Sequence, residues 1–127
     1  MPEESYRFRP TPEVRTFGQI LGHIANSHYG FCSEIKGEKN PQERIDFEEK
    51  TTKAELVKAI DDSIVYCDAV YAAFKDGAKA LEPMKSRSTD TPFSALMSNL
   101  THDNEHYGNL VTYLRMKGIV PPSSARP

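Results

Sequence analysis

Two histidines lie four residues apart in the stretch LTHDNEHYGNLVTYLRMKGIVPP, which begins at Leu100. Side chains at positions i and i+4 sit one above the other on a helix, with Cβ atoms about 6 Å apart, so the imidazoles of His102 and His106 could reach one divalent ion. This spacing alone is weak evidence, because H-x-x-x-H arises readily by chance. The chemistry that it permits is metal binding, and such a site needs a third ligand.

The third ligand has two histidine candidates, His23 and His28. A zincin-type protease is excluded, because the residue after the first histidine of the pair is Asp103 rather than Glu and no histidine follows His106. Periodicity favours His28, which lies near the centre of an apolar helix face, whereas His23 lies about 120° to its side. A histidine in the middle of an apolar face is more often a core residue than a ligand. Residue spacing therefore leaves the choice open.

Three long helices are predicted to carry these histidines. Threonine caps, a proline at a first helical position and terminal glycines indicate helices over residues 17–36, from Thr52 to near Asp76 and Gly77, and over 92–117. The first 15 residues are predicted to be extended, and residues 119–127 form a C-terminal tail. No alternating strand pattern is present. The sequence predicts one all-α domain over residues 1–127, a helical bundle.

Apolar residues at helical spacing define the expected core faces of the second and third helices. The predicted core residues are Val57, Ile60, Ile64, Cys67, Tyr71 and Phe74 on the second helix, and Phe93, Leu96, Met97, Leu100, Tyr107, Val111 and Leu114 on the third. His102 and His106 lie about 140–180° from the stripe on the third helix. Their face has small and polar residues without Lys or Glu, so we expect it to be covered too or to line a cavity.

Composition and charge exclude some classes of function. The chain has 127 residues and a formal net charge of −2, and its Lys and Arg residues are scattered, so we expect no binding to nucleic acid or to a membrane surface. No apolar run approaches the roughly 18 residues of a membrane span. Cys32 and Cys67 lie far apart without C-x-x-C spacing, and we expect two buried, reduced thiols in a cytoplasmic protein.

The stretches RTFGQILGHIANSHYGFC and HDNEHYGNLVTYLRMKGIVPPSS together resemble the DinB-like family of metal-dependent proteins, over nearly the whole chain. The family pattern has one histidine in an H-I-A context, then H-x-x-x-H-x-G, then YLR-x-K-G and a proline pair. The resemblance implies that His23, His102 and His106 bind a zinc, nickel or similar divalent ion. It leaves His28 as a pocket-lining or second-layer residue. It also implies a four-helix bundle with a long crossover connection, commonly a homodimer.

The resemblance implies two kinds of chemistry on a small-molecule substrate. Some family members resemble transferases or isomerases that use a low-molecular-weight thiol, and others resemble hydrolases. The catalytic residues stay unassigned, because no carboxylate is placed as a general base. Glu105 could orient a histidine, and the Tyr113 hydroxyl could reach a ligand on the metal. The alternative is a non-catalytic structural or stress-related dimer with a structural or vestigial metal site.

The chain departs from the family pattern before MPEESYRFRP, where family members carry a further long helix. We therefore expect three long helices and a fourth bundle position that a partner subunit fills, or else a truncated reading frame. A bundle that lacks one member leaves apolar surface exposed and favours association. The expected homodimer interface includes residues 6–12 or the helices beside the vacant position.

Overall fold

Three long helices dominate the structure. The computed structural model describes residues 1–74, 77–85 and 90–125. Its elements are η1 (Glu3–Ser5), α1 (Phe17–Lys36), η2 (Phe47–Glu49), α2 (Lys53–Ala73), α3 (Gly77–Ala80), α4 (Pro92–Met116) and η3 (Pro122–Ser124). These described ranges contain no strand, which confirms the all-α class. Within the same ranges, no helix is both long enough and apolar enough to cross a membrane.

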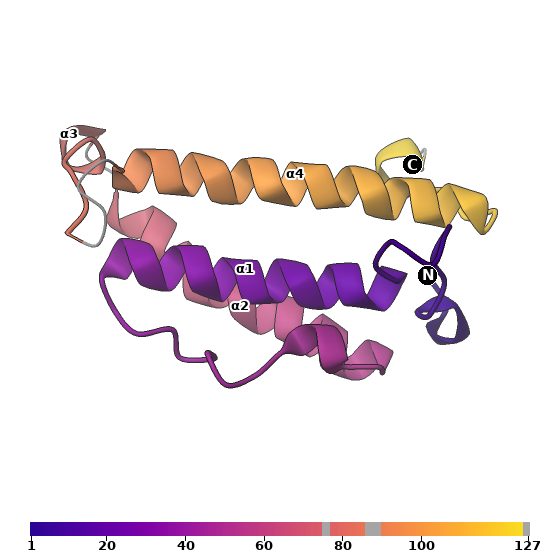
Figure 1. Ribbon diagram of the computed structural model, residues 1–127. Coiled ribbons are helices and arrows are strands. Elements are labelled where there is room, and N and C mark those ends of the chain that lie inside the picture. The colour runs from indigo at the N-terminus through magenta and orange to yellow at the C-terminus, as the bar shows by residue number, and fades with distance from the viewer. Residues whose placement is uncertain (75–76, 86–89, 126–127) are drawn as a thin grey trace.

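The central element is α1, against which both α2 and α4 pack, whereas contact between α2 and α4 is sparse. In Figure 1, α4 runs antiparallel to α1. The connection that follows α1 returns along the bundle before α2 begins, so α2 runs parallel to α1 (Figure 1). This return path is the long crossover that the family resemblance implied. Residues of α1 can therefore contact two helices at once.

Threonine caps set the starts of the long helices. The Thr16 hydroxyl accepts a hydrogen bond from the Gln19 backbone N–H at 3.2 Å, and the Gln19 side chain accepts one from the Thr16 N–H at 2.9 Å. Thr52 and Thr91 cap α2 and α4 in the same way. Gly37 ends α1 with a φ of 67°, in the left-handed region that favours glycine. The predicted bounds of α1 are thus confirmed.

The other two helices end close to their predicted positions. α4 ends at Met116, one residue before the prediction. α2 ends at Ala73, earlier than predicted. Asp76, near which we expected the end, lies outside the described residues, and Gly77 begins the short helix α3 rather than ending α2.

The N-terminal segment folds onto the start of α1, so the prediction of an extended segment over residues 1–15 is wrong in part. Residues 3–5 form the 3-10 turn η1. The Tyr6 side chain is buried, with its ring centroid 5.3 Å from that of Phe17, and its carbonyl accepts a hydrogen bond from the Gly18 N–H at 2.9 Å. Apolar burial of Tyr6 thus outweighs the extended preference of the prolines around it.

Two apolar clusters form the core. One lies near the start of α1 and contains Tyr6, Phe17, Ile20, Ile24, Leu56, Tyr113 and Leu114. The other lies toward the end of α1 and contains Cys32, Cys67 and Val70, with Ile35, Tyr66, Phe74 and Leu96 packed against it. Between the two clusters, the α4 side chains that contact α1 are mostly polar, and the predicted metal ligands are among them.

The predicted core faces of α2 and α4 are wrong in large part. Seven of their apolar side chains are exposed, from 39% for Tyr71 to 52% for Phe93. We call these residues the outer apolar surface: Val57, Ile64 and Tyr71 on α2, and Phe93, Met97, Leu100 and Tyr107 on α4. The faces against α1 instead bury polar residues such as Ser63 and Asn99. Periodicity finds the most apolar face of a helix, but it cannot show that α1 offers partners to a more polar one.

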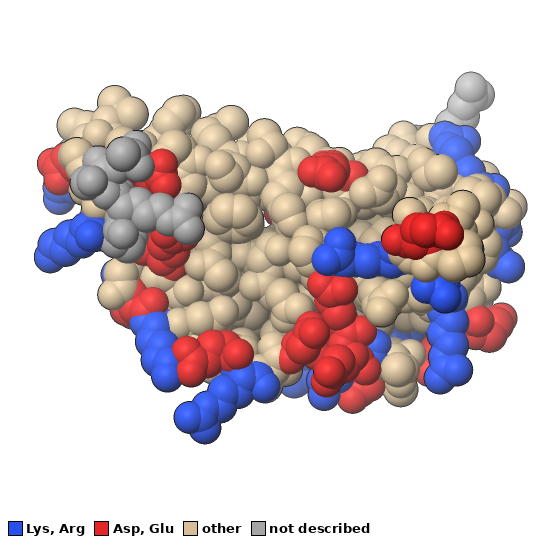
Figure 2. All heavy atoms as spheres, in the orientation of Figure 1, with Lys and Arg blue, Asp and Glu red and all other residues tan. Residues whose placement is uncertain are grey.

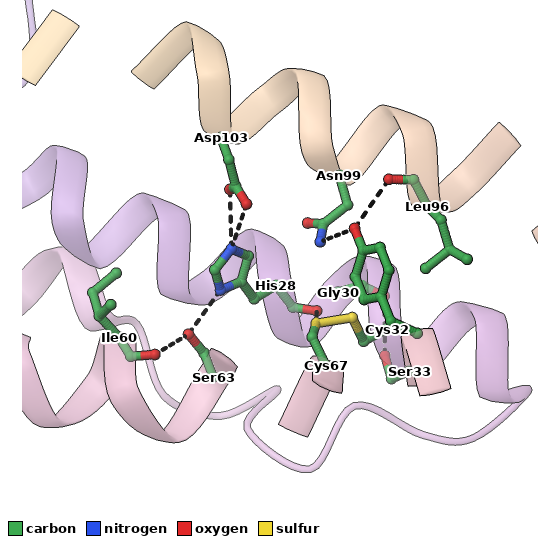
Figure 3. Close-up of a disulfide and its surroundings, with 11 residues drawn as sticks. His28, Gly30, Cys32, Ser33, Ile60, Ser63, Cys67, Leu96, Asn99 and Asp103 are labelled. Atoms are coloured by element: carbon green, nitrogen blue, oxygen red, sulfur yellow. Dashed lines mark hydrogen bonds and ion pairs between the residues drawn. A yellow bond between two sulfur atoms is a disulfide. The ribbon is translucent and has the colours of Figure 1, made fainter. Parts of the chain in front are cut away.

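The expectation of two reduced thiols is also wrong. Cys32 on α1 and Cys67 on α2 form a disulfide, with their Cα atoms 5.5 Å apart (Figure 3). The two residues are 35 positions apart in sequence but face one another where the helices pack, which spacing alone could not reveal. The bond ties α2 to α1. The premise of reduced thiols, on which we based a cytoplasmic location, is thereby lost.

A glycine lets the segment before α2 approach α1 closely. A Cβ atom on Gly22 would lie 2.6 Å from the Glu48 backbone nitrogen and closer still to the Phe47 carbonyl group. Backbone atoms cannot yield at such distances without moving the segment. Gly22 therefore allows η2 to lie against α1, one residue before His23.

We predict that Gly22→Ala lowers the free energy of unfolding by about 1–3 kcal/mol, because the methyl group must displace η2. Gly30→Ala is a matched control on the same helix, where a Cβ atom would meet nothing within 4 Å. That change should raise the free energy of unfolding by about 0.5–1 kcal/mol through better helix propensity. Urea denaturation followed by circular dichroism measures both, and equal effects in the two variants would contradict the close approach.

Candidate metal centre

Three histidines from two helices point their rings at one another. His23 comes from α1, and His102 and His106 come from successive turns of α4. The Nε2 atom of His102 lies 3.1 Å from the Nε2 atoms of both His23 and His106. One nitrogen of each ring lies within 4.8 Å of the other two. The structure thus brings together the three residues that the family resemblance nominated.

The spacing of these nitrogens fits a metal ion. Two nitrogens bonded at about 2.0–2.1 Å to one tetrahedral ion lie about 3.3–3.4 Å apart. Hydrogen bonding does not explain the cluster as well, because a neutral His102 ring has at Nε2 either one proton or one lone pair, yet it faces two nitrogens. Its other nitrogen, Nδ1, is buried without a hydrogen-bond partner among the described residues. A shared cation would satisfy the three lone pairs together.

Glu48 in η2 fixes the orientation of His23. Its Oε1 atom lies 2.8 Å from Nδ1 of His23, and because a carboxylate only accepts, Nδ1 carries the proton and Nε2 keeps its lone pair. The Oε2 atom accepts a hydrogen bond from Arg15 Nε at 2.9 Å. A carboxylate behind a histidine is the usual arrangement at metal sites, because it sets the tautomer and increases the basicity of the ligand.

Sequence reasoning missed Glu48. It lies in the charged connection GEKNPQERIDFEEK, which shows no apolar stripe. The segment is placed by Asn26, one turn after His23: its amide donates to Asp46 at 2.7 Å and accepts from the Phe47 N–H at 3.1 Å. Asp46 in turn accepts from the Glu48 N–H at 2.9 Å. The connection contains several carboxylates, and only these contacts across the fold show that the Glu48 carboxylate is the one that contacts His23.

Burial keeps the α4 histidines neutral. It lowers the pKa of His102, and the neighbouring His106 and His23 rings lower it further. Burial is also the main cause that lowers the pKa of His106, followed by the nearby His23 ring. A charged imidazolium cannot bind a cation, so a lowered pKa keeps the ligand nitrogens available at neutral pH.

His28 does not join the three histidines. Its ring is buried, with Nδ1 2.9 Å from the Ser63 hydroxyl and Nε2 2.9 Å from Oδ1 of Asp103 (Figure 3). Serine, histidine and aspartate in contact resemble a hydrolytic triad, but Ser63 has no exposed surface and cannot meet a substrate. His28 thus lies beside the metal centre, with its nitrogens turned to other partners.

Glu105 and Tyr113, the two other residues predicted to lie at the site, line a cavity beside His106. The cavity has a volume of about 550 Å³. Its lining residues are Glu13, Val14, Arg15, Ile20, Glu48, Glu105, His106, Asn109 and Tyr113. Glu105 is exposed there, whereas the buried Tyr113 hydroxyl donates to the Arg15 carbonyl at 2.8 Å. This bond places the Tyr113 hydroxyl against the chain before α1.

We predict that the metal-free protein loses stability as pH falls below about 6.5, the usual pKa of histidine in an unfolded chain. The folded state holds His102 and His106 at lowered pKa values, so the unfolded state takes up protons first and acid favours it. Melting temperatures between pH 7.5 and pH 5, measured with a chelator present, test this. His106→Gln should give a shallower decline, and an unchanged slope would contradict the prediction.

Comparison with known proteins assigns the chain to a family. No curated protein and no solved structure shows significant similarity to the chain. The family model of the DinB superfamily matches residues 1–110, which include all three clustered histidines. Because this match covers most of the sequence, the chain belongs to the DinB superfamily.

Proposed function

We propose that this protein is a metal-dependent enzyme whose divalent ion, zinc or nickel, is held by His23, His102 and His106. The observation that carries the proposal is the 3.1 Å spacing of the Nε2 atoms around His102, which suits ligands of one ion. Neutral imidazoles are common ligands of both metals. The residues behind them, Glu48 and Arg15, support the same assignment.

A catalytic role fits the number of ligands better than a structural one. Structural zinc sites have four protein ligands, whereas catalytic sites keep one position open, and the cluster in the described part of the chain has three members. His23, His102 and His106 would hold the ion, which would supply Lewis-acid chemistry to a molecule bound beside them. The alternative, a structural or vestigial site in a non-catalytic protein, requires a fourth ligand from the protein or a site that binds no ion.

The cavity beside His106 is where we place a small-molecule substrate. Arg15 is about half exposed, and its Nε atom already binds Glu48, so its terminal nitrogens can meet an anionic group. Glu105 is exposed in this cavity and makes no side-chain ion pair or hydrogen bond among the described residues, so its carboxylate can contact a bound molecule there. Transfer to or from a low-molecular-weight thiol and hydrolysis both suit this arrangement.

Cobalt spectroscopy separates the catalytic proposal from the structural alternative. Azide, which does not reduce the Cys32–Cys67 disulfide, should give an azide-to-cobalt absorption band in the cobalt-loaded protein, because the open position admits it. A closed site with four protein ligands would show no new band. Activity assays on thiol-transfer and ester or amide substrates, with the metal-loaded protein, then distinguish the two reaction types.

We predict that His102→Ala and His106→Ala each lower bound zinc by at least about a hundredfold after dialysis, because two remaining imidazoles chelate weakly. His23→Ala should have the same effect. His28→Ala should lower metal content less, since its ring nitrogens bind Ser63 and Asp103. Elemental analysis of the purified variants measures these contents. A loss in His28→Ala as large as in the others would count against His23 as the third ligand.

We also propose that the protein forms a homodimer through the outer apolar surface. Its α2 part faces α4, because the Tyr71 hydroxyl donates to the Leu96 carbonyl at 3.1 Å. The seven side chains carry no charge, so two copies can meet without repulsion. The side of α4 toward the viewer in Figure 2, which is not the side that faces α2, also carries few charged side chains, whereas many gather below it. Leaving such surface in water costs roughly 25 cal/mol per Å².

We predict a dimer at micromolar concentration, with an interface above about 2,000 Å² in total. Leu100→Arg places a charge within the outer apolar surface and should give a monomer. Met116→Arg is the control, because Met116 is also exposed on α4 but lies outside that surface. Light scattering of the three proteins tests this. A monomeric parent protein would refute the dimer, and a dimeric Leu100→Arg variant would show that another surface forms it.

A further inference from the structure

Around the histidines, α1 and α4 meet mainly through polar side chains, and the Phe31 ring of α1, 6.0 Å from the His102 ring, adds one aromatic contact. Leu96 packs against the disulfide cluster, and Leu110 packs against the cluster near the start of α1. These two residues are 14 positions apart, which is about 21 Å along a helix. Between them, the side chains that turn toward α1 are polar. Apolar clusters thus hold α4 at its two ends, and hydrogen bonds help to set its rotation at the level of the proposed metal centre.

Apart from the contacts among the three clustered histidines, the shortest hydrogen bond between α1 and α4 is made by His28. Its Nε2 atom lies 2.9 and 3.0 Å from the two Asp103 oxygens, and because a carboxylate accepts, Nε2 donates. On the opposite side of the ring, Nδ1 meets the Ser63 hydroxyl of α2. One buried ring thus bridges α1 to both other long helices (Figure 3). Its two bonds, in opposite directions, leave it little freedom to turn.

Adjacent residues of α1 contact adjacent residues of α4. The Ser27 hydroxyl lies 3.4 Å from Nε2 of His102, while His28 binds Asp103. Successive residues on a helix are about 100° apart. When Asp103 is held on one side of the α1–α4 contact, His102 therefore points to the other side. His23 lies on that side, about one turn earlier on α1. The contact between Ser27 and His102 is long and weak, so the rotation of α4 about its axis depends mainly on the bond between His28 and Asp103.

We propose that His28 is a positioning residue of the metal centre: its bond to Asp103 holds α4 at the rotation that aims His102 and His106 at His23. This inference rests on the proposed metal site for its consequence, but the ring arrangement it explains exists without an ion. His28 itself does not touch the ion or the cavity. Its effect is transmitted through the backbone of α4, from Asp103 to the neighbouring His102.

Two amide substitutions separate the two bonds of the ring. The side-chain nitrogen of glutamine takes the place of Nε2, so His28→Gln keeps the bond to Asp103 and loses the one to Ser63. The shorter asparagine takes the place of Nδ1, so His28→Asn keeps the bond to Ser63 and loses the one to Asp103. Both variants remove an imidazole from the same buried position. If His28 only stabilised the fold, the two variants would therefore have similar effects on metal binding.

We expect His28→Asn to weaken cobalt binding about tenfold, the lower end of the losses seen for residues behind metal ligands. His28→Gln should stay within about twofold of the parent protein. Tyr71→Phe is the control, because it removes two hydrogen bonds between α2 and α4, to Leu96 and Asn99, outside the proposed site. Its affinity should not change. Equal affinities for the Gln and Asn variants would overturn the proposal.

A second measurement needs no metal. In the metal-free parent protein and in His28→Gln, nuclear Overhauser effects should connect the ring protons of His102 with those of His23, and His28→Asn should lose them. Asp103→Ala offers the same test if His28→Asn does not fold, because the Asp103 side chain is 36% exposed. Retained ring contacts in the variants without this bond would overturn the proposal. A parent protein that shows the contacts but binds no cobalt would refute the proposed function and leave the positioning role supported.

Discussion

The fold depends on a polar contact between two antiparallel helices, in which the Nε2 atom of His102 lies 3.1 Å from the Nε2 atoms of both His23 and His106. Such a contact is costly unless every buried polar group finds a partner. Apolar clusters at its two ends provide the burial that holds α1 and α4 together. Carboxylates beside the contact, Glu48 at His23 and Asp103 at His28, orient the rings. A cation among the three nitrogens would complete it.

The polar contact also explains the outside of the molecule. Because α4 turns its histidines toward α1, its most apolar residues, such as Phe93 and Leu100, face outward. α2 shows a similar rotation, with Ser63 buried beneath His28 and Ile64 exposed. Polar side chains that face α1 thus leave the outer apolar surface exposed. This is the surface on which we place a second copy of the chain. The disulfide fixes α2 on α1 independently of that surface.

Local signals in the sequence predicted the helices well. Caps such as Thr16 and stop residues such as Gly37 act within a few residues, and they are visible in one chain. The H-x-x-x-H spacing indicated a site, but only the family resemblance chose His23 as its third member. Contacts across the fold were out of reach: the Cys32–Cys67 bond and the carboxylate of Glu48 depend on how the crossover returns. The inward faces were misjudged because hydrogen-bond partners do not show in periodicity.

X-ray absorption spectroscopy of the protein loaded with one equivalent of zinc would report the ligands of the ion. We expect three imidazole nitrogens at about 2.0–2.1 Å and one further light atom from solvent. Loss of one imidazole from the spectrum in His23→Ala would identify the α1 ligand. A spectrum dominated by oxygen ligands, or one unchanged by removal of His23, would contradict a centre built across the α1–α4 contact.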